Sequence, residues 1–189
     1  MDSNEALNRL MEGNKRFIGD AMEHRCFSSR REELKAGQQP FATVVCCSDS
    51  RIVPEYIFDV GLGDIFTVIT AGNVVDKIGV GSAEYAVGHL HTPVLIVLGH
   101  EKCGAVNAAY HGHGESDILA IVKKLAPSIK KAKKGGDEAE ELEKAAVYNV
   151  KAVMRKLKKS PVIKKALDEG KVRIVGMKYH LSGNVEVVA

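Results

Sequence analysis

Two short polar clusters contain the residue types best suited to chemistry in this chain. Cys47 lies in the first cluster, and His100 and Cys103 lie three residues apart in the second. Two thiolates and an imidazole suit Zn²⁺, and on a turn or helix start His100 and Cys103 could reach one ion. Three protein ligands would leave the fourth tetrahedral position for water, as in a catalytic zinc site. Spacing alone leaves open the alternative that both cysteines are small, buried hydrophobic residues.

The first cluster also contains an acidic and a basic residue two positions apart, Asp49 and Arg51. The Asp49 carboxylate could accept a hydrogen bond from a zinc-bound water and orient it for attack. The Arg51 guanidinium could hold that carboxylate ionised and away from the metal. Without Arg51, Asp49 would itself be a competent fourth ligand. The alternative is that this segment is an ordinary surface turn.

The elements that must position these clusters alternate between short apolar runs and helical patterns. Five strands are expected, over residues 41–46, 65–70, 94–98, 172–177 and 185–188. Seven helices are expected, over residues 4–18, 28–36, 80–90, 104–110, 117–132 and 137–158, with the last opened by Pro161. Continuously apolar strands alternating with helices indicate an α/β fold, a central, mostly parallel sheet with helices on both faces.

The turn-like residues 182–184 before the last expected strand predict an antiparallel edge strand. We expect a single domain over residues 1–189, in which residues 1–36 form an N-terminal helical arm. Each polar cluster directly follows one of the expected parallel strands. Ligands of open α/β sheets bind outside the carboxyl ends of the strands, so two clusters far apart in sequence can meet there. Their shared place favours the metal interpretation.

Composition excludes several other classes of protein. The 189 residues are 45% hydrophobic, and 27 basic against 24 acidic side chains give a net charge of +3. The hydrophobic fraction excludes a wholly disordered chain, and the small net charge does not indicate a nucleic-acid-binding surface. No apolar run approaches the roughly 20 residues that span a membrane, and the first residues show no apolar signal segment. We expect a cytoplasmic protein without membrane or nucleic-acid partners, whose 4 cysteines serve metal binding or catalysis rather than disulfides.

Residues 47–51 (CSDSR) and 100–105 (HEKCGA) together resemble the motifs of the β-class carbonic anhydrases. The resemblance runs from about residue 6 to residue 188 and is weak over residues 111–171. It also includes residues 10–17, 71–73 and 81–87. It implies an enzyme, a carbonate dehydratase, that reversibly hydrates CO₂ to bicarbonate and a proton by attack of zinc-bound hydroxide on CO₂.

The resemblance also assigns roles to single residues. It implies one zinc ion per chain, with Cys47, His100 and Cys103 as its ligands. It implies Asp49 and Arg51 as the catalytic residues, acting on CO₂ and bicarbonate.

Three further positions, Gln38, Phe66 and Tyr85, match substrate-contacting residues of the plant-like branch of the family. Without the resemblance they would be a loop amide, a core strand residue and a helix-packing residue. The family site is assembled at a subunit interface, so the resemblance implies a homodimer or a higher homo-oligomer. Some of the three residues could then serve the zinc of the neighbouring chain.

Three positions depart from patterns in the family. Ile69 stands where members usually have Arg, and His180 stands where an acidic residue is common. Val44 stands where the allosteric, bicarbonate-inhibited branch has a Trp, three residues before the first ligand cysteine. We therefore predict the open-site branch, in which Asp49 pairs with Arg51 rather than binding the metal.

The other candidate residues receive structural interpretations. Cys46 precedes Cys47 on a strand and so faces the opposite side, in the core. Cys26 is expected to be a free thiol. His111 and His113 are expected in a flexible loop rather than in a second metal site.

Three alternative functions remain open. The same scaffold could hydrolyse carbonyl sulfide or carbon disulfide with identical active-site residues. Metal-free chemistry at Cys46 and Arg51 would resemble a phosphatase loop, but the segment between them is one residue short and lacks anion-cradling glycines. A non-catalytic, zinc-stabilised module that senses bicarbonate would not require the pair of Asp49 and Arg51.

Overall fold

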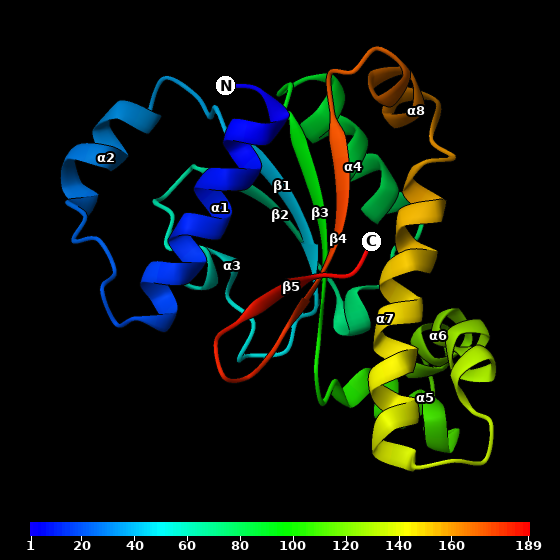
Figure 1. Cartoon of the computed structure of the whole chain (residues 1–189). Helices are drawn as coiled ribbons and strands as arrows, with labels where there is room; N and C mark the ends of the chain where they lie inside the picture. The colour runs from blue at the N-terminus through cyan, green and yellow to red at the C-terminus, as the bar shows by residue number, and fades with distance from the viewer.

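The strands of the computed structural model, which describes all 189 residues, form one sheet in the order β2-β1-β3-β4-β5 (Figure 1). Their bounds are β1 Ala42–Cys46, β2 Ile65–Ile69, β3 Val94–His100, β4 Arg173–Tyr179 and β5 Val185–Val187. The first four pair in parallel, and β5 pairs antiparallel with β4. The predicted α/β fold, with a mostly parallel sheet and an antiparallel edge strand, is confirmed.

The two central strands explain why the apolar runs are continuous. Every residue of β1 and β3 is buried, because helices cover both faces of the sheet. β3 continues two residues beyond its predicted end, through His100, because it stays in register with β4 as far as Tyr179. This extension places His100 at the carboxyl edge of the sheet.

Helices flank and connect the strands. Their bounds are α1 Ser3–Ile18, α2 Phe27–Leu34, α3 Pro54–Ile57, η1 Ala71–Asn73, α4 Lys77–Gly88, α5 Gly104–His111, α6 Ile118–Ala132, α7 Glu138–Leu157 and α8 Pro161–Asp168. All seven predicted helices are present. The predicted start of α4 at residue 80 is wrong, because Asp76 caps the helix by accepting a hydrogen bond from the Gly79 N–H. The pattern does not predict α3 and η1, which are too short to show a period.

None of these helices combines the length and the apolar character that crossing a membrane requires.

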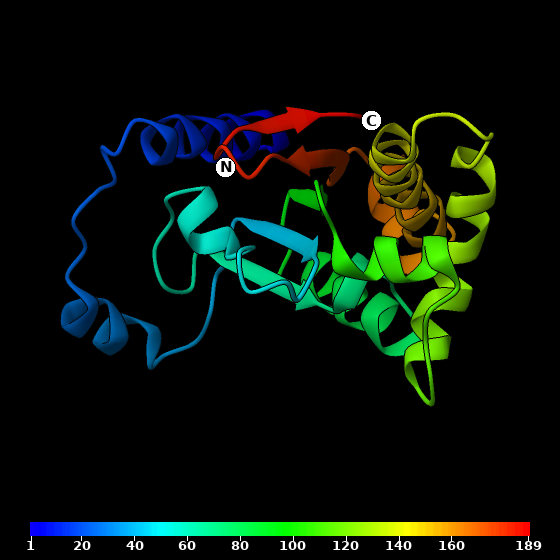
Figure 2. The same cartoon turned by 90° about the horizontal axis from the view of Figure 1, so that it is seen from below.

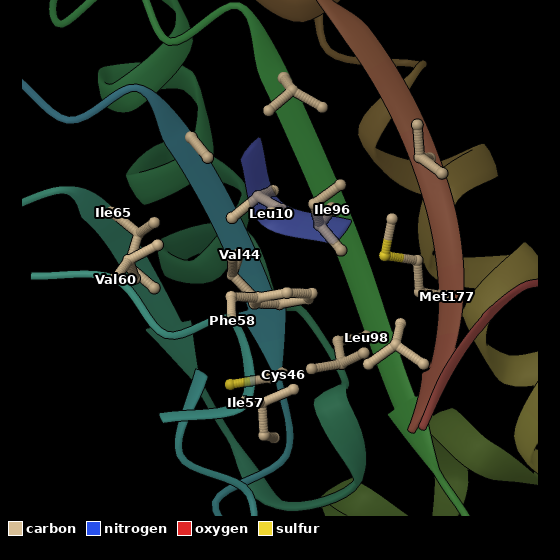
Figure 3. Close-up of a cluster of buried hydrophobic side chains, with 14 of the residues drawn as sticks. Leu10, Val44, Cys46, Ile57, Phe58, Val60, Ile65, Ile96, Leu98 and Met177 are labelled. Carbon is tan, nitrogen blue, oxygen red and sulfur yellow. The ribbon is translucent and has the colours of Figure 1, made fainter. Parts of the chain in front are cut away.

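Three clusters of buried side chains separate the layers. α1 and α3 pack on one face of the sheet, where Leu10, Val44, Phe58, Ile96 and Met177 share a core (Figure 3). α4, α7 and α8 cover the opposite face. α5 and α6 pack against α7 beyond the carboxyl ends of β1 and β3, as Figures 1 and 2 show. This third cluster forms the wall around both polar segments.

The two N-terminal helices differ in how they contact the rest of the chain. α1 begins with a capping box of Asp2 and Glu5 and buries Ala6 and Leu10 on the sheet. α2 buries none of its residues and stands apart from the sheet in both views (Figures 1 and 2). The division into one domain with an arm at residues 1–36 stays a prediction.

Candidate metal centre

Three side chains from two strand ends meet at the carboxyl edge of the sheet. Cys47 is the first residue after β1, His100 is the last residue of β3, and Cys103 directly precedes α5. All three are buried, and their candidate ligand atoms lie within 4.8 Å of one another. The structure therefore brings together the three metal ligands expected from the sequence.

The atoms of this group fit a tetrahedral zinc site. The sulfur atoms of Cys47 and Cys103 are 3.9 Å apart, against about 3.8 Å for two sulfurs that each lie 2.3 Å from one tetrahedral zinc ion. His100 Nδ1 donates a hydrogen bond of 2.9 Å to the Glu101 carbonyl oxygen, which leaves Nε2 with the free lone pair. Nε2 is buried and has no hydrogen-bond partner. A metal ion is the partner that such a nitrogen beside two thiols would accept.

Backbone N–H groups point at the sulfur of Cys47. The N–H of Gly72 donates to Cys47 Sγ at 3.1 Å, and the N–H of Asp49 donates to it at 3.4 Å. Gly72 lies in η1 with a φ of 67°, a left-handed conformation that glycine adopts without a steric penalty. A Cβ at this position would also lie only 3.0 Å from the Cβ of Ala105. These donors stabilise a thiolate at Cys47.

A buried amide that the sequence analysis missed holds this backbone in place. Asn149 of α7 is 2% exposed, and its Nδ2 donates to the Gly72 carbonyl at 2.8 Å and to Asn73 Oδ1 at 3.3 Å. A signal was present in the sequence, because Asn149 lies on the apolar stripe of its helix beside Val150 and Ala146. A polar residue on such a stripe needs a buried partner.

The two thiols are coupled through their contact. Hydrogen bonding from Cys103 is the largest cause that lowers the pKa of Cys47; burial opposes it, and the backbone N–H groups of Asp49 and Gly72 add to it. The same contact raises the pKa of Cys103. The first proton therefore leaves the pair readily and the second does not, because two thiolates repel each other at 3.9 Å. A divalent cation between the sulfurs would offset that repulsion.

The predicted pairing of Asp49 with Arg51 is present beside this group. Arg51 Nε donates to Asp49 Oδ1 at 2.9 Å, and Nη2 donates to Oδ2 at 2.7 Å. Hydrogen bonding from this guanidinium, opposed by burial, holds the pKa of Asp49 well below its usual range. Arg51 Nη2 also donates to the Lys102 carbonyl at 3.3 Å. Asp49 is therefore an ionised carboxylate near neutral pH, with both oxygens engaged by Arg51.

Comparison with known proteins agrees with this geometry. The sequence profile of the carbonic anhydrase family matches residues 42–185, a range that includes both polar clusters. The β-carbonic anhydrase CafA of Aspergillus fumigatus has the same fold, with a TM-score of 0.81 and 26% identity, over 97% of this chain and 91% of that one. This chain belongs to the β-class carbonic anhydrases. Carbonic anhydrase 2 of Mycobacterium tuberculosis H37Rv is 39% identical to it over 183 residues, 93% of this chain and 87% of the relative. The carbonic anhydrase of Mycolicibacterium smegmatis is 39% identical over 190 residues, 96% of this chain and 91% of the relative.

The three predicted substrate residues of this carbonic anhydrase lie away from its own Cys-His-Cys group. Phe66 on β2 and Tyr85 on α4 are neighbours, with ring centroids 6.2 Å apart, and both line a cavity of about 930 Å³. No residue of the metal centre lines that cavity. Phe66 is in register with Thr43, near the start of β1. Gln38 is exposed and precedes β1, at the end of the strand opposite Cys47.

The three departures from the family patterns occupy distinct places in this carbonic anhydrase. Ile69 ends β2 at the sheet edge, with its side chain half exposed. His180 Nε2 lies 3.0 Å from Glu186, and Nδ1 lies 3.7 Å from Glu101, so the ring sits between two acids. Val44 is fully buried in the core of Figure 3.

The remaining cysteines and histidines have structural surroundings. Cys46 is fully buried in the core, as predicted, and burial raises the pKa of its thiol to about 12. Cys26 is exposed and free, as predicted. The expectation of a loop at His111 is wrong, because this residue ends α5, and Gly112 caps the helix with a φ of 71°. His113 follows the cap, with its ring stacked on that of His111.

Proposed function

We propose that this carbonic anhydrase hydrates CO₂ reversibly to bicarbonate and a proton with one zinc ion per chain, held by Cys47, His100 and Cys103. The observation that carries the proposal is the buried Nε2 of His100, which has no hydrogen-bond partner beside two thiols 3.9 Å apart. When bound, zinc would act as a Lewis acid that makes a water molecule nucleophilic near neutral pH.

Asp49 and Arg51 are the proposed catalytic residues. The Asp49 carboxylate accepts a hydrogen bond from the attacking water and directs its lone pair at the carbon of CO₂. Arg51 keeps Asp49 ionised and engages both of its oxygens, so that Asp49 does not close the site as a fourth ligand. This pairing, together with Val44 in place of a tryptophan, supports assignment to the open-site branch.

Gln38, Phe66 and Tyr85 are proposed to contact substrate in the site of a neighbouring chain. They lie away from the Cys-His-Cys group of their own chain, and Ile78 and Tyr85 of α4 expose apolar surface beside the cavity that Phe66 lines. A second copy that covers this surface would bring its own metal centre to Phe66 and Tyr85. The proposed assembly is a homodimer or a higher homo-oligomer.

Two finer points belong to the same proposal. The four free cysteines support a cytoplasmic location, where thiols stay reduced. Carbonyl sulfide or carbon disulfide would meet the same residues as CO₂, so assaying sulfide release beside CO₂ hydration separates the two activities. A bicarbonate-sensing module without catalysis would show neither activity.

Zinc binding is tested by X-ray absorption at the zinc edge together with metal analysis. We expect one zinc ion per chain. Two sulfur atoms should lie about 2.3 Å from zinc, and nitrogen or oxygen ligands should lie about 2.0–2.1 Å from it. Cys103→Ser and His100→Ala should lose zinc, whereas Cys26→Ser is the matched control and should keep it. Full zinc content in both site variants would contradict the assigned ligands.

A further inference from the structure

We propose that Glu143 of α7 and Lys178 of β4 form a positioning pair for the turn between His100 and Cys103. Neither residue belongs to the Cys-His-Cys group or to the pair of Asp49 and Arg51. The inference rests on the proposed function, because the turn matters only if Cys103 binds metal and Arg51 acts on Asp49.

Lys102 is the residue through which the pair acts. Its N–H donates to Glu143 Oε1 at 3.2 Å, and its carbonyl oxygen accepts from Arg51 Nη2 at 3.3 Å. Lys102 has a φ of 52°, in the left-handed region that residues other than glycine rarely adopt. Such a conformation persists only where the surroundings hold it. The contacts on both sides of Lys102 hold the backbone immediately before Cys103.

Two glycines bring α7 close enough to make this contact. A Cβ on Gly99 of β3 would lie 2.6 Å from Val150, and a Cβ on Gly176 of β4 would lie 2.6 Å from Met154. A Cβ on Gly176 would also lie 2.8 Å from Val150, so glycine at both positions lets the helix lie close to the sheet. Val150 and Met154 are seven and eleven residues after Glu143, so all three share one helix face. The face that packs on the glycines therefore carries Glu143 to the end of β3.

Lys178 fixes the second oxygen of the same carboxylate. It pairs in register with Gly99, and its Nζ forms an ion pair of 2.5 Å with Glu143 Oε2. The Lys178 side chain is only 12% exposed, so solvent screens the pair less than it screens a surface ion pair. One oxygen of Glu143 thus faces the Lys178 ammonium as an ion pair, and the other accepts from the Lys102 N–H.

Removing the pair should therefore loosen the turn without removing any zinc ligand. Without Glu143 the Lys102 N–H loses its acceptor, and the backbone can relax toward the right-handed region. Cys103 Sγ would then leave its place 3.9 Å from Cys47 Sγ, and Arg51 would lose the Lys102 carbonyl. Groups that orient metal ligands from outside the ligand set typically change metal affinity by roughly 10- to 100-fold.

The test compares Glu143→Ala, Glu143→Gln and Glu140→Ala with wild type. Zinc affinity is measured by competition with a chelator, and the thiolate-to-metal absorption of the cobalt-substituted proteins reports site geometry. We expect Glu143→Ala to lose roughly 10- to 100-fold in zinc affinity and to change the cobalt spectrum. Glu143→Gln keeps an acceptor oxygen for the Lys102 N–H but loses the oxygen that pairs with Lys178, so it should restore only part of both. Glu140 is an exposed glutamate of the same helix that pairs only with Lys144, so Glu140→Ala should match wild type.

Wild-type zinc affinity and an unchanged cobalt spectrum in Glu143→Ala would overturn the inference, as would an equal loss in Glu140→Ala. If Glu143→Ala fails to fold, Lys178→Met serves as the second variant. We expect it to lose less zinc affinity than Glu143→Ala would. Unchanged zinc affinity in Lys178→Met would contradict the proposed pair. If wild type binds zinc and hydrates CO₂ but Glu143→Ala has wild-type zinc affinity, only this inference is rejected and the proposed function stands. A wild type that binds no zinc removes the proposed function, and the inference with it.

Discussion

The Arg51 guanidinium donates hydrogen bonds to both carboxylate oxygens of Asp49, with Nε 2.9 Å from Oδ1 and Nη2 2.7 Å from Oδ2. The backbone N–H of Arg51 adds a third hydrogen bond of 3.0 Å to Oδ1. A planar fork matched to a carboxylate in this way fixes its direction as well as its charge. Asp49 is thereby kept available as a hydrogen-bond acceptor beside the metal centre.

Replacing Arg51 by Leu should close the site. Freed from the guanidinium, Asp49 becomes a competent fourth ligand, so activity should fall roughly 10- to 100-fold while zinc is retained. X-ray absorption should then show an additional oxygen close to zinc. An unchanged ligand set with full activity would contradict the role given to Arg51.

Asn149→Ala should weaken both the fold and the metal site. The substitution leaves the Gly72 carbonyl without its buried donor, which costs about 1–3 kcal/mol of unfolding free energy. Because the N–H of Gly72 contacts Cys47 Sγ, zinc affinity should also fall. Urea unfolding and chelator competition measure the two effects. Asn107→Ala, at an exposed position on α5, is the matched control and should change neither.

Because of Glu141, we expect the free energy of unfolding of this enzyme to fall at acid pH. Its buried carboxylate accepts hydrogen bonds from Tyr110 Oη and from the backbone N–H of Gly136, and its pKa falls to about 2, with the Tyr110 bond as the largest cause. A pKa that is lower in the folded state stabilises the protein above the unfolded pKa. That stabilisation is lost as the pH falls from about 4.5 toward about 2.

Glu141→Gln removes this ionisation and keeps one acceptor oxygen for the backbone N–H groups, while its NH₂ group can donate to Tyr110 Oη. We expect the urea midpoint of the variant to depend less steeply on pH below 5 than that of wild type. Above that range the urea midpoints of the variant and of wild type should depend on pH equally steeply, because Glu141 is ionised in both the folded and the unfolded state. Equal slopes throughout would show that Glu141 is not linked to acid stability.

The proposed interface predicts complementation between chains. Asp49→Ala abolishes the site of its own chain, and Gln38→Ala should weaken the site of the neighbouring chain. A co-expressed mixture therefore contains assemblies in which an intact Asp49 faces an intact Gln38. CO₂ hydration by the mixture should exceed the average of the two separate variants. No gain in the mixture would place Gln38 in the site of its own chain or in no site at all.

The strands and the meeting of the two clusters could be predicted because the responsible signals are local. β1 and β3 are continuous apolar runs, and Cys47 and His100 fall at their carboxyl ends. Parallel strands bring such ends to one edge of a sheet. The ligand set and the pairing of Asp49 with Arg51 therefore followed from spacing and from motif resemblance.

The supporting contacts could not be predicted because they depend on how distant elements pack. The left-handed φ of Lys102 and its bond to Glu143 exist only because α7 lies against Gly99 and Gly176. Nothing near Glu143 in the sequence distinguishes it from the exposed Glu140 one turn earlier. Of these supporting residues, only Asn149 had a signal in the sequence, because it is a polar residue on the apolar stripe of its helix.

The central claim is that the Cys-His-Cys group holds a catalytic zinc ion served by Asp49. Stopped-flow CO₂ hydration, run on wild type and Asp49→Ala at matched zinc content, tests it most directly. We predict rapid hydration by the wild type and a loss of roughly 100-fold or more in Asp49→Ala, with zinc retained. Zinc-loaded wild type that hydrates CO₂ no faster than buffer, or a variant as fast as wild type, would contradict the account.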